Sequence, residues 1–209
     1  MTTRTATTAV AVHPLLAERW SPRSFDPTRT ISDEELLPLL EAARWAPSAR
    51  NRQPWRFLVG RRGDTTYQRI FATLMSSNQL WAGNSSLLVA AVAAEFQENG
   101  TPNHGSAYDT GLAVAQLSVQ AHALGLHAHQ MGGFDPDRLR TSLEVPDGYR
   151  PLSVTAIGAL APADLLPGDL RARETATRER RPLTETFFAE TWGKPLPVRY
   201  EPEIPPYDA

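Results

Sequence analysis

Four short segments of the sequence carry the residues that could bind a ligand. The first is residues 19–23, Arg-Trp-Ser-Pro-Arg, in which Arg19 and Arg23 flank Ser21. Guanidinium groups bind phosphate or the electron-rich edge of a heterocycle through paired N–H donors, and the serine hydroxyl adds another donor. This spacing predicts an anion and hydrogen-bond site. The alternative is a basic turn exposed to solvent.

The second segment, residues 46–55, is a polar loop between a predicted helix and a predicted strand. Pro47 and Pro54 stiffen it, while Ser48, Asn51 and Gln53 offer donors and acceptors to a flat polar ligand. Binding residues are often placed on such loops, and this one is more polar than a connection requires. An ordinary helix-to-strand connection is the alternative.

The other two segments offer backbone N–H groups and positive charge. Gly132 and Gly133 lie between a strand and a helix, where adjacent glycines let a ligand approach the backbone closely. The dinucleotide fingerprint G-x-G-x-x-G is absent there. Residues 178–183 hold Arg178, Arg180 and Arg181, a cluster that suits a phosphate. A solvated helix end explains that cluster as well.

Several other chemistries lack the residues they need. The chain has no cysteine, so disulfides, cysteine nucleophiles and iron–sulfur clusters are excluded. His127 and His129 alternate along a predicted strand without a placed carboxylate, so no metal site is predicted. No Gly-X-Ser-X-Gly motif supports serine catalysis. Asp109, inside a predicted helix, is interpreted as a structural acid.

The composition describes a folded protein of ordinary charge. The 209 residues include 21 Lys+Arg and 23 Asp+Glu, and 41% are hydrophobic. This balance argues against a general nucleic-acid binder and against wholesale disorder. No stretch reaches the roughly 20 apolar residues of a membrane helix, and residues 1–12 lack the apolar core and the cleavage signal of a secretory peptide. We therefore expect a cytoplasmic protein that associates with neither nucleic acid nor membrane.

The expected elements alternate along one α/β or α+β domain. Ser32 and Glu35 form a capping box, which predicts a helix that Pro38 disturbs and that ends before Pro47. Further helices are predicted at residues 65–75, at 106–124 with Gly125 as its cap, and after Asp135. Strands are predicted at residues 56–60, 87–94, 126–130 and 153–160. Residues 1–12 are expected to form a disordered tail, and the proline-rich residues 193–209 an extended arm.

Taken in order, these segments resemble the flavin-dependent nitroreductase family. The resemblance covers roughly residues 13–190 and includes the helix around Asp109 and Gly111. It implies an α+β fold of three layers over residues 13–192, with a mostly antiparallel central sheet flanked by helices and an extended C-terminal arm. It also implies a homodimer that binds FMN at the subunit interface and passes hydride from NAD(P)H through the flavin to a small electrophile.

The resemblance assigns the cofactor-binding residues by motif. Arg19, Arg178 and Arg180 are expected at the FMN phosphate. Ser21 and Arg23 are expected at the pyrimidine side of the ring, with Trp20 and Pro22 in the same segment. Pro47, Ser48 and Asn51 would reach the ring from the other subunit. Asn78 would face the flavin, and Gly133, with Gly132 beside it, would bond flavin N5 through its N–H. No side chain is expected to act as acid or base, because the flavin supplies the chemistry.

Some positions depart from the family pattern. Pro22 stiffens the first motif, Ala49 replaces a serine that many relatives carry, and residues 97–105 are compact where other members insert lid helices. Substrate preference is therefore not transferred from any relative. Two other functions stay open: an FMN-binding or carrier protein without turnover, and a flavin enzyme that oxidises its substrate with O₂ or fragments the flavin. A generic anion-binding α/β domain is a more distant alternative.

Overall fold

The computed structural model describes residues 4–198 of the chain. The chain divides into two compact units. The larger unit is Trp20–Thr175, and the smaller unit combines the two chain ends, Met1–Arg19 with Ala176–Ala209. The domain limits expected from the sequence, with a tail at residues 1–12 and an arm at 193–209, stay predictions. Residues 1–3 of that tail and 199–209 of that arm lie outside the described residues.

The larger unit is built on one antiparallel sheet of four strands. The strands are β1 (Trp55–Arg61), β2 (Leu87–Ala94), β3 (His127–Met131) and β4 (Tyr149–Gly158), in the order β1-β2-β4-β3. Every neighbouring pair is antiparallel, and the register of β2 on β4 shifts between Ala91 and Val92. The predicted α+β fold with an antiparallel sheet is confirmed. Strand β3 lies at the sheet edge, and the segment that follows it pairs through Phe134 with Leu74.

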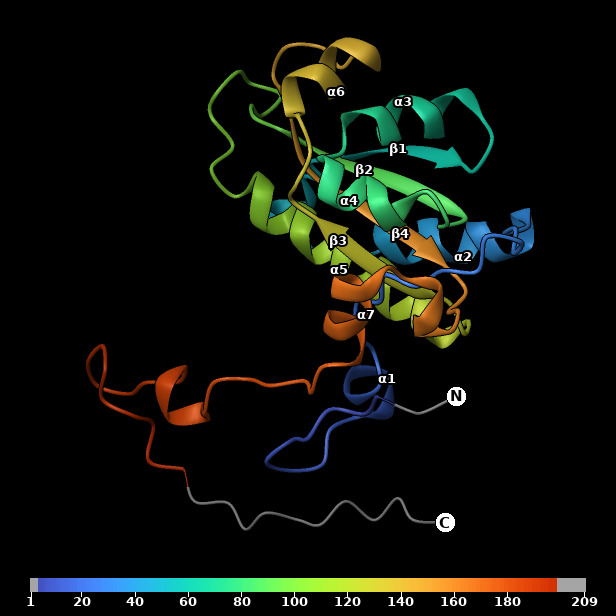
Figure 1. Cartoon of the computed structure of the whole chain (residues 1–209). Helices are drawn as coiled ribbons and strands as arrows, with labels where there is room; N and C mark the ends of the chain where they lie inside the picture. The colour runs from blue at the N-terminus through green and yellow to red at the C-terminus, as the bar shows by residue number, and fades with distance from the viewer. Residues whose placement is uncertain (1–3, 199–209) are drawn as a thin grey trace. The chain divides into compact units, whose positions relative to one another are not determined.

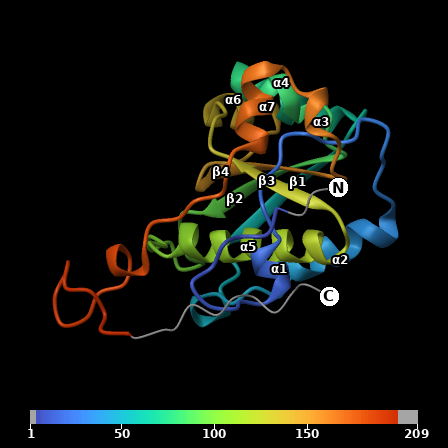
Figure 2. The same cartoon turned by 60° about the horizontal axis from the view of Figure 1, so that its bottom comes forward.

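Helices cover both faces of this sheet, which gives three layers (Figures 1 and 2). Helices α2 (Asp33–Arg44) and α5 (Ser106–Ala123) pack against each other on one face. Four shorter helices lie on the opposite face: α3 (Thr65–Thr73), α4 (Ser76–Ala82), α6 (Pro136–Ser142) and α7 (Gly168–Thr175). Short 3₁₀ turns occupy Ala49–Asn51 and Ala163–Leu165.

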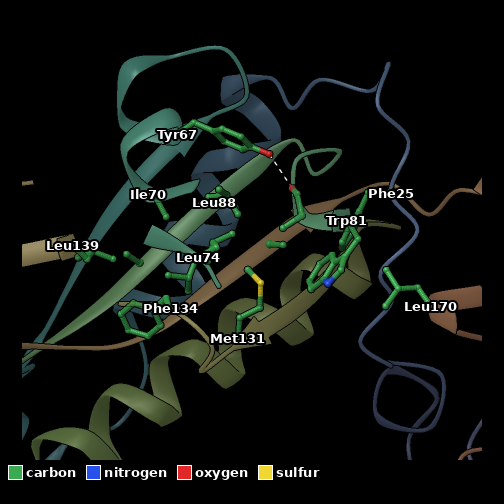
Figure 3. Close-up of a cluster of buried hydrophobic side chains, with 14 of the residues drawn as sticks. Phe25, Tyr67, Ile70, Leu74, Trp81, Leu88, Met131, Phe134, Leu139 and Leu170 are labelled. Carbon is green, nitrogen blue, oxygen red and sulfur yellow. Dashed lines mark hydrogen bonds between the residues drawn. The ribbon is translucent and has the colours of Figure 1, made fainter. Parts of the chain in front are cut away.

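Strand β2 separates two hydrophobic cores. Leu87 and Val89 face the core under α2 and α5, while Leu88 and Ala90 face the core under the four shorter helices. This follows from the period of two residues in a strand, and it explains why nearly the whole strand is buried. Figure 3 shows the second core, in which Trp81 of α4 stacks on the ring of Phe25 with 6.1 Å between centroids.

Local signals in the sequence set the ends of several helices. Ser32 and Glu35 form the expected capping box of α2, and the helix continues through Pro38 as far as Arg44. Gly125 follows α5 with a φ of +72°, the left-handed conformation expected of a glycine cap. Asp135 caps α6, whose first residue is Pro136. These caps fix the ends of the helices that flank the candidate site.

Two differences from the sequence expectations affect the site. Strand β4 begins at Tyr149, four residues before its predicted start, because Arg150 and Pro151 pair with β2 across the register shift. The predicted helix at residues 65–75 ends at Thr73, and a separate helix, α4, follows. The second difference matters because α4 carries Asn78.

The smaller unit contains little regular structure among its described residues. Helix α1 (Pro14–Ala17) and a 3₁₀ turn at Leu183–Glu185 are its helical segments. Near the arm, the chain turns at Gly193, with a φ of +85°, and Phe188 pairs with Pro195. The guanidinium of Arg178 donates to the carbonyl oxygens of Arg4, Ala17 and Arg19, so it ties the two chain ends of this unit together.

Candidate functional site

The segment from Trp20 to Ser24 is fixed by a buried carboxylate. Glu174 of α7 is 3% exposed, and its two carboxylate oxygens accept the backbone N–H of Arg23 at 2.9 Å and that of Ser24 at 3.0 Å. One of them also lies 4.0 Å from Nη1 of Arg23. Hydrogen bonds to an ionised acceptor are among the stronger ones in proteins. The backbone at Arg23 is therefore held rigidly against α7.

The same segment is held from β3 by His129. Its Nδ1 lies 2.8 Å from the carbonyl oxygen of Pro22, which can only accept, so Nδ1 carries the proton. The imidazole packs on Trp81 with 4.6 Å between ring centroids. Burial lowers the pKa of His129 to about 4, outweighing the bond to Pro22, and the nearby Arg23 lowers it further. At neutral pH, His129 is an uncharged donor that positions Pro22.

Arg23 is a half-buried cation at this point. Burial lowers its pKa most, Arg173 lowers it further, and Glu174 opposes both effects. A guanidinium keeps its charge in any protein environment. The segment predicted to bind an anion or a heterocycle edge thus presents a desolvated positive charge on a fixed backbone.

The three arginines expected at the FMN phosphate, Arg19, Arg178 and Arg180, all belong to the smaller unit. The pKa of Arg19 is lowered by burial and then by Arg180, and that of Arg178 by burial, then Arg19 and Arg180. Among residues 4–198, no carboxylate lies within 4.0 Å of Arg19 or Arg180. Two neighbouring cations repel each other when no acidic side chain neutralises them, so the binding of an anion between them is favourable. Arg178 differs, since its donors reach backbone carbonyls, and its phosphate contact stays a prediction.

The polar loop after α2 has a strained backbone. Arg50 and Asn51 both have a φ of 54° and Gln53 has 47°, in the left-handed region that side chains rarely adopt. The hydroxyl of Ser48 accepts the N–H of Gln53 at 3.0 Å, and Oδ1 of Asn51 accepts its side-chain amide at 3.0 Å. Non-glycine residues held in such conformations cluster at ligand sites. The loop is therefore more than a simple connection.

Asp109 anchors that loop to α5. It is 4% exposed, and its Oδ2 accepts the backbone N–H of Ala49 at 3.1 Å. This contact supports the interpretation of Asp109 as a structural acid. Pro47 is exposed next to the anchor, but in the described chain no hydrogen bond or ion pair joins Ser48 or Asn51 to the segment at Arg23.

The junction between β3 and α6 brings Gly133 to Asn78. The side-chain amide of Asn78 donates to the carbonyl oxygen of Gly133 at 2.9 Å, and the backbone N–H of Met75 donates to the same oxygen at 3.0 Å. Within residues 4–198 the N–H of Gly133 donates no hydrogen bond. A Cβ at Gly133 would lie 2.8 Å from Nδ2 of Asn78, whereas one at Gly132 would meet nothing within 4 Å.

Sequence reasoning did not find the roles of two residues that position the site. Glu174 lies in a polar, arginine-rich stretch that showed no chemistry, and only its spacing from Leu170 on one helical face could have indicated burial. His129 was singled out, yet its contact with Pro22 crosses more than a hundred residues of sequence. A single sequence carries no signal for such a pairing.

The described residues hold neither a membrane-crossing helix nor a metal cluster. No helix within residues 4–198 combines the length and the apolar character that a membrane span requires. No group of three or more His, Asp or Glu side chains in the same range is arranged to hold a metal ion.

Comparison with known proteins decides the family. The model of the nitroreductase family matches residues 16–80 and 70–159, more than half of the chain. The chain belongs to the nitroreductase family. It is therefore an oxidoreductase, as curated relatives named NAD(P)H nitroreductases support. The resemblance noted from the sequence motifs is thereby confirmed.

Three relatives show how far this nitroreductase-family similarity extends. An uncharacterised 15.4 kDa protein of Mycolicibacterium smegmatis is 36% identical over 68% of this chain and 99% of its own length. A Bacillus subtilis protein named NAD(P)H nitroreductase YdgI is 27% identical over 70% of this chain and 87% of its own. A crystal structure described as an oxidoreductase containing FMN has a TM-score of 0.86 and 37% identity, covering 92% of this chain and 98% of its own.

Proposed function

We propose that this protein is an FMN-dependent oxidoreductase that takes hydride from NAD(P)H and passes it to a small electrophile by a ping-pong mechanism. The electrophile is a nitroaromatic, a quinone or an enone. The observation that carries the proposal is the rigid segment at Arg23, which Glu174 and His129 hold from two separate elements. The similar structure that contains FMN supports the choice of cofactor.

The residues of this chain fit the chemical groups of FMN. A phosphate needs cations without acidic partners, and Arg19 and Arg180 meet that condition among the described residues. A flavin ring nitrogen needs a donor, and the N–H of Gly133 is unpaired within residues 4–198. The absence of a side chain at Gly132 leaves the backbone there open to a planar group. Each condition comes from the chain's own geometry.

The residues around the proposed flavin site have separate roles. When bound, FMN supplies the two-electron hydride chemistry. Arg23 provides positive charge for the pyrimidine side of the ring, where negative charge develops on reduction, and Ser21 adds a hydroxyl donor. Asn78 holds Gly133 in place through its carbonyl and so restrains the residue whose N–H would face the flavin. Glu174 and His129 are positioning residues, because they act through the backbone of Arg23 and Pro22.

We further propose that the working unit is a homodimer in the cytoplasm, with FMN at the subunit interface. The loop with Pro47, Ser48 and Asn51 would serve the ring bound mainly by the partner subunit. The absence of hydrogen bonds between this loop and the segment at Arg23, among the described residues, agrees with such a division. The small electrophile is the other partner, and nucleic acid and membrane are not.

Flavin spectroscopy tests the proposal. The purified protein should be yellow, release FMN on denaturation, and lose its visible absorbance rapidly when NADH or NADPH is added without oxygen. A colourless protein that does not take up added FMN would refute the cofactor. Binding without bleaching would indicate a carrier. Slow bleaching by nicotinamides with rapid use of O₂ would indicate an oxidase of the same fold.

A further inference from the structure

A large polar cleft lies in the larger unit, beside the loop assigned to the flavin ring. It has a volume of about 780 Å³ and lies between the strained loop after α2, the start of β4 and residues 94–103. That volume is within the roughly 300–1,000 Å³ of small-molecule sites. The compact connection over residues 97–105 thus contributes one wall of an open cavity.

The cleft carries an excess of positive charge. Arg50, Arg52 and Arg56 line it, against Glu98 as its single acidic residue. Arg56 donates to the backbone carbonyls of Gln53 and Trp55, so it also holds the wall together. Among residues 4–198, Arg50 and Arg52 form neither an ion pair nor a side-chain hydrogen bond. Two guanidinium groups without partners on one rim suit a phosphate monoester.

The cleft also offers groups that recognise a planar base. Phe96 is 52% exposed, and the guanidinium of Arg56 lies over the ring of Tyr149, 5.9 Å from its centroid. The carboxamide of Asn103, which lines the cleft, forms no hydrogen bond within residues 4–198 and is not fully shielded from solvent, so its donor and acceptor are open to a ligand. Asparagine pairs with the N6 and N7 edge of adenine.

The position of the cleft links it to the reaction. Asn51 and Gln53 belong to its lining, and Asn51 is one of the residues assigned to the flavin ring. A molecule whose reactive end lies on the flavin could therefore extend its other end into the cleft. NADPH has this form, with a nicotinamide at one end and an adenosine 2′-phosphate at the other.

We propose that this cleft binds the adenosine 2′-phosphate of NADPH and makes NADPH the preferred hydride donor. Arg50 and Arg52 bind the 2′-phosphate, Phe96 stacks on the adenine, and the Asn103 carboxamide bonds its edge. An arginine near the 2′-position is a common means of selecting NADP over NAD. The inference rests on the proposed function for the identity of the donor, but the binding site itself does not depend on turnover.

The test combines direct binding with steady-state kinetics on the FMN-loaded protein. In the variant Arg50→Asn with Arg52→Gln, asparagine is chosen because it tolerates the left-handed backbone at position 50. The control, Arg69→Gln with Arg138→Gln, removes the same charge from helices α3 and α6, outside the cleft. Calorimetry measures the affinity of adenosine 2′,5′-bisphosphate, and thermal melting checks that both variants fold.

We expect the bisphosphate to bind the native protein and the control equally, and the cleft variant at least about tenfold more weakly. The kcat/KM for NADPH should fall by a similar factor in the cleft variant, with that for NADH unchanged. Equal bisphosphate affinity in all three proteins would overturn the inference. So would a change confined to the KM of an anionic acceptor such as nitrobenzoate. If bisphosphate binds in the cleft but neither nicotinamide bleaches the flavin, the proposed function fails while the binding site stands.

Discussion

Replacing Glu174 tests the most connected residue of the site. Its carboxylate is buried and accepts two backbone N–H groups, those of Arg23 and Ser24, at 2.9 to 3.0 Å. In Glu174→Gln the side chain keeps its shape but has one acceptor oxygen in place of two. The remaining oxygen can still accept both N–H groups, but the amide NH₂ then lies against the N–H of Arg23, and the charge that strengthened both bonds is gone.

The expected loss follows from these contacts. Hydrogen bonds to charged groups contribute about 1.5–3 kcal/mol, so losing the charge and placing an NH₂ against a buried N–H in Glu174→Gln should lower the free energy of unfolding by about 1.5–3 kcal/mol. Glu174→Ala removes every acceptor and leaves Arg23 without its counter-charge. Breaking a buried pair in this way costs about 3–5 kcal/mol. Asp169→Asn, an exposed carboxylate on the same helix, should change stability far less.

Urea unfolding followed by circular dichroism measures the stability of the three variants, and FMN titration measures the consequence for the site. Because Glu174 acts on the backbone at Arg23, the folded Glu174→Gln protein should itself bind FMN several-fold more weakly than the native protein does. If Glu174→Gln matches Asp169→Asn in both measurements, then the buried carboxylate neither stabilises the fold nor positions the segment, and the reasoning is wrong.

Three further predictions concern pH, the glycine junction and the phosphate. Burial lowers the pKa of His129 to about 4, so as the pH falls this histidine is protonated in the unfolded chain before it is protonated in the folded one. The free energy of unfolding, measured in urea, should therefore drop by about 2 kcal/mol between pH 7 and pH 5. His129→Asn should abolish this part of the pH dependence. Gly133→Ala places a Cβ 2.8 Å from Nδ2 of Asn78 and should weaken FMN binding by about tenfold in a fluorescence titration, whereas Gly111→Ala, with open space around its Cβ, should not. Arg19→Ala should cost about 1.5–3 kcal/mol of FMN binding but leave riboflavin binding unchanged, and an equal loss for both flavins would contradict the phosphate role.

The fold was largely predictable because its signals are local. The capping box at Ser32, the glycine cap at Gly125 and the pair Asp135 and Pro136 each mark a helix end within a few residues of sequence. The continuous apolar run of β2 indicated a strand buried on both faces. Helices α4 and α7 were missed because they are short, and tertiary packing of Trp81 and Leu170 stabilises them more than any periodic pattern.

The sequence predicts candidate ligand-binding residues but not the groups that support them. Motif spacing points to Arg23, Ser48 and Gly133, each of which is only partly buried, and their contacts with a ligand stay predictions. The groups that hold them, Glu174 and His129, come from distant parts of the chain. Burial and hydrogen bonding turn an ordinary glutamate and histidine into positioning residues, and neither property can be read from one sequence.

The support that His129 gives to the Arg23 segment depends on pH. His129 must be neutral to lie buried against Trp81, because burial lowers its pKa to about 4. Protonation of His129 would add a cation beside Arg23 and Arg173, which already repel each other. Protonation of His129 therefore loosens the segment at Pro22, on the side of β3. Flavin binding should accordingly weaken as the pH falls toward 4.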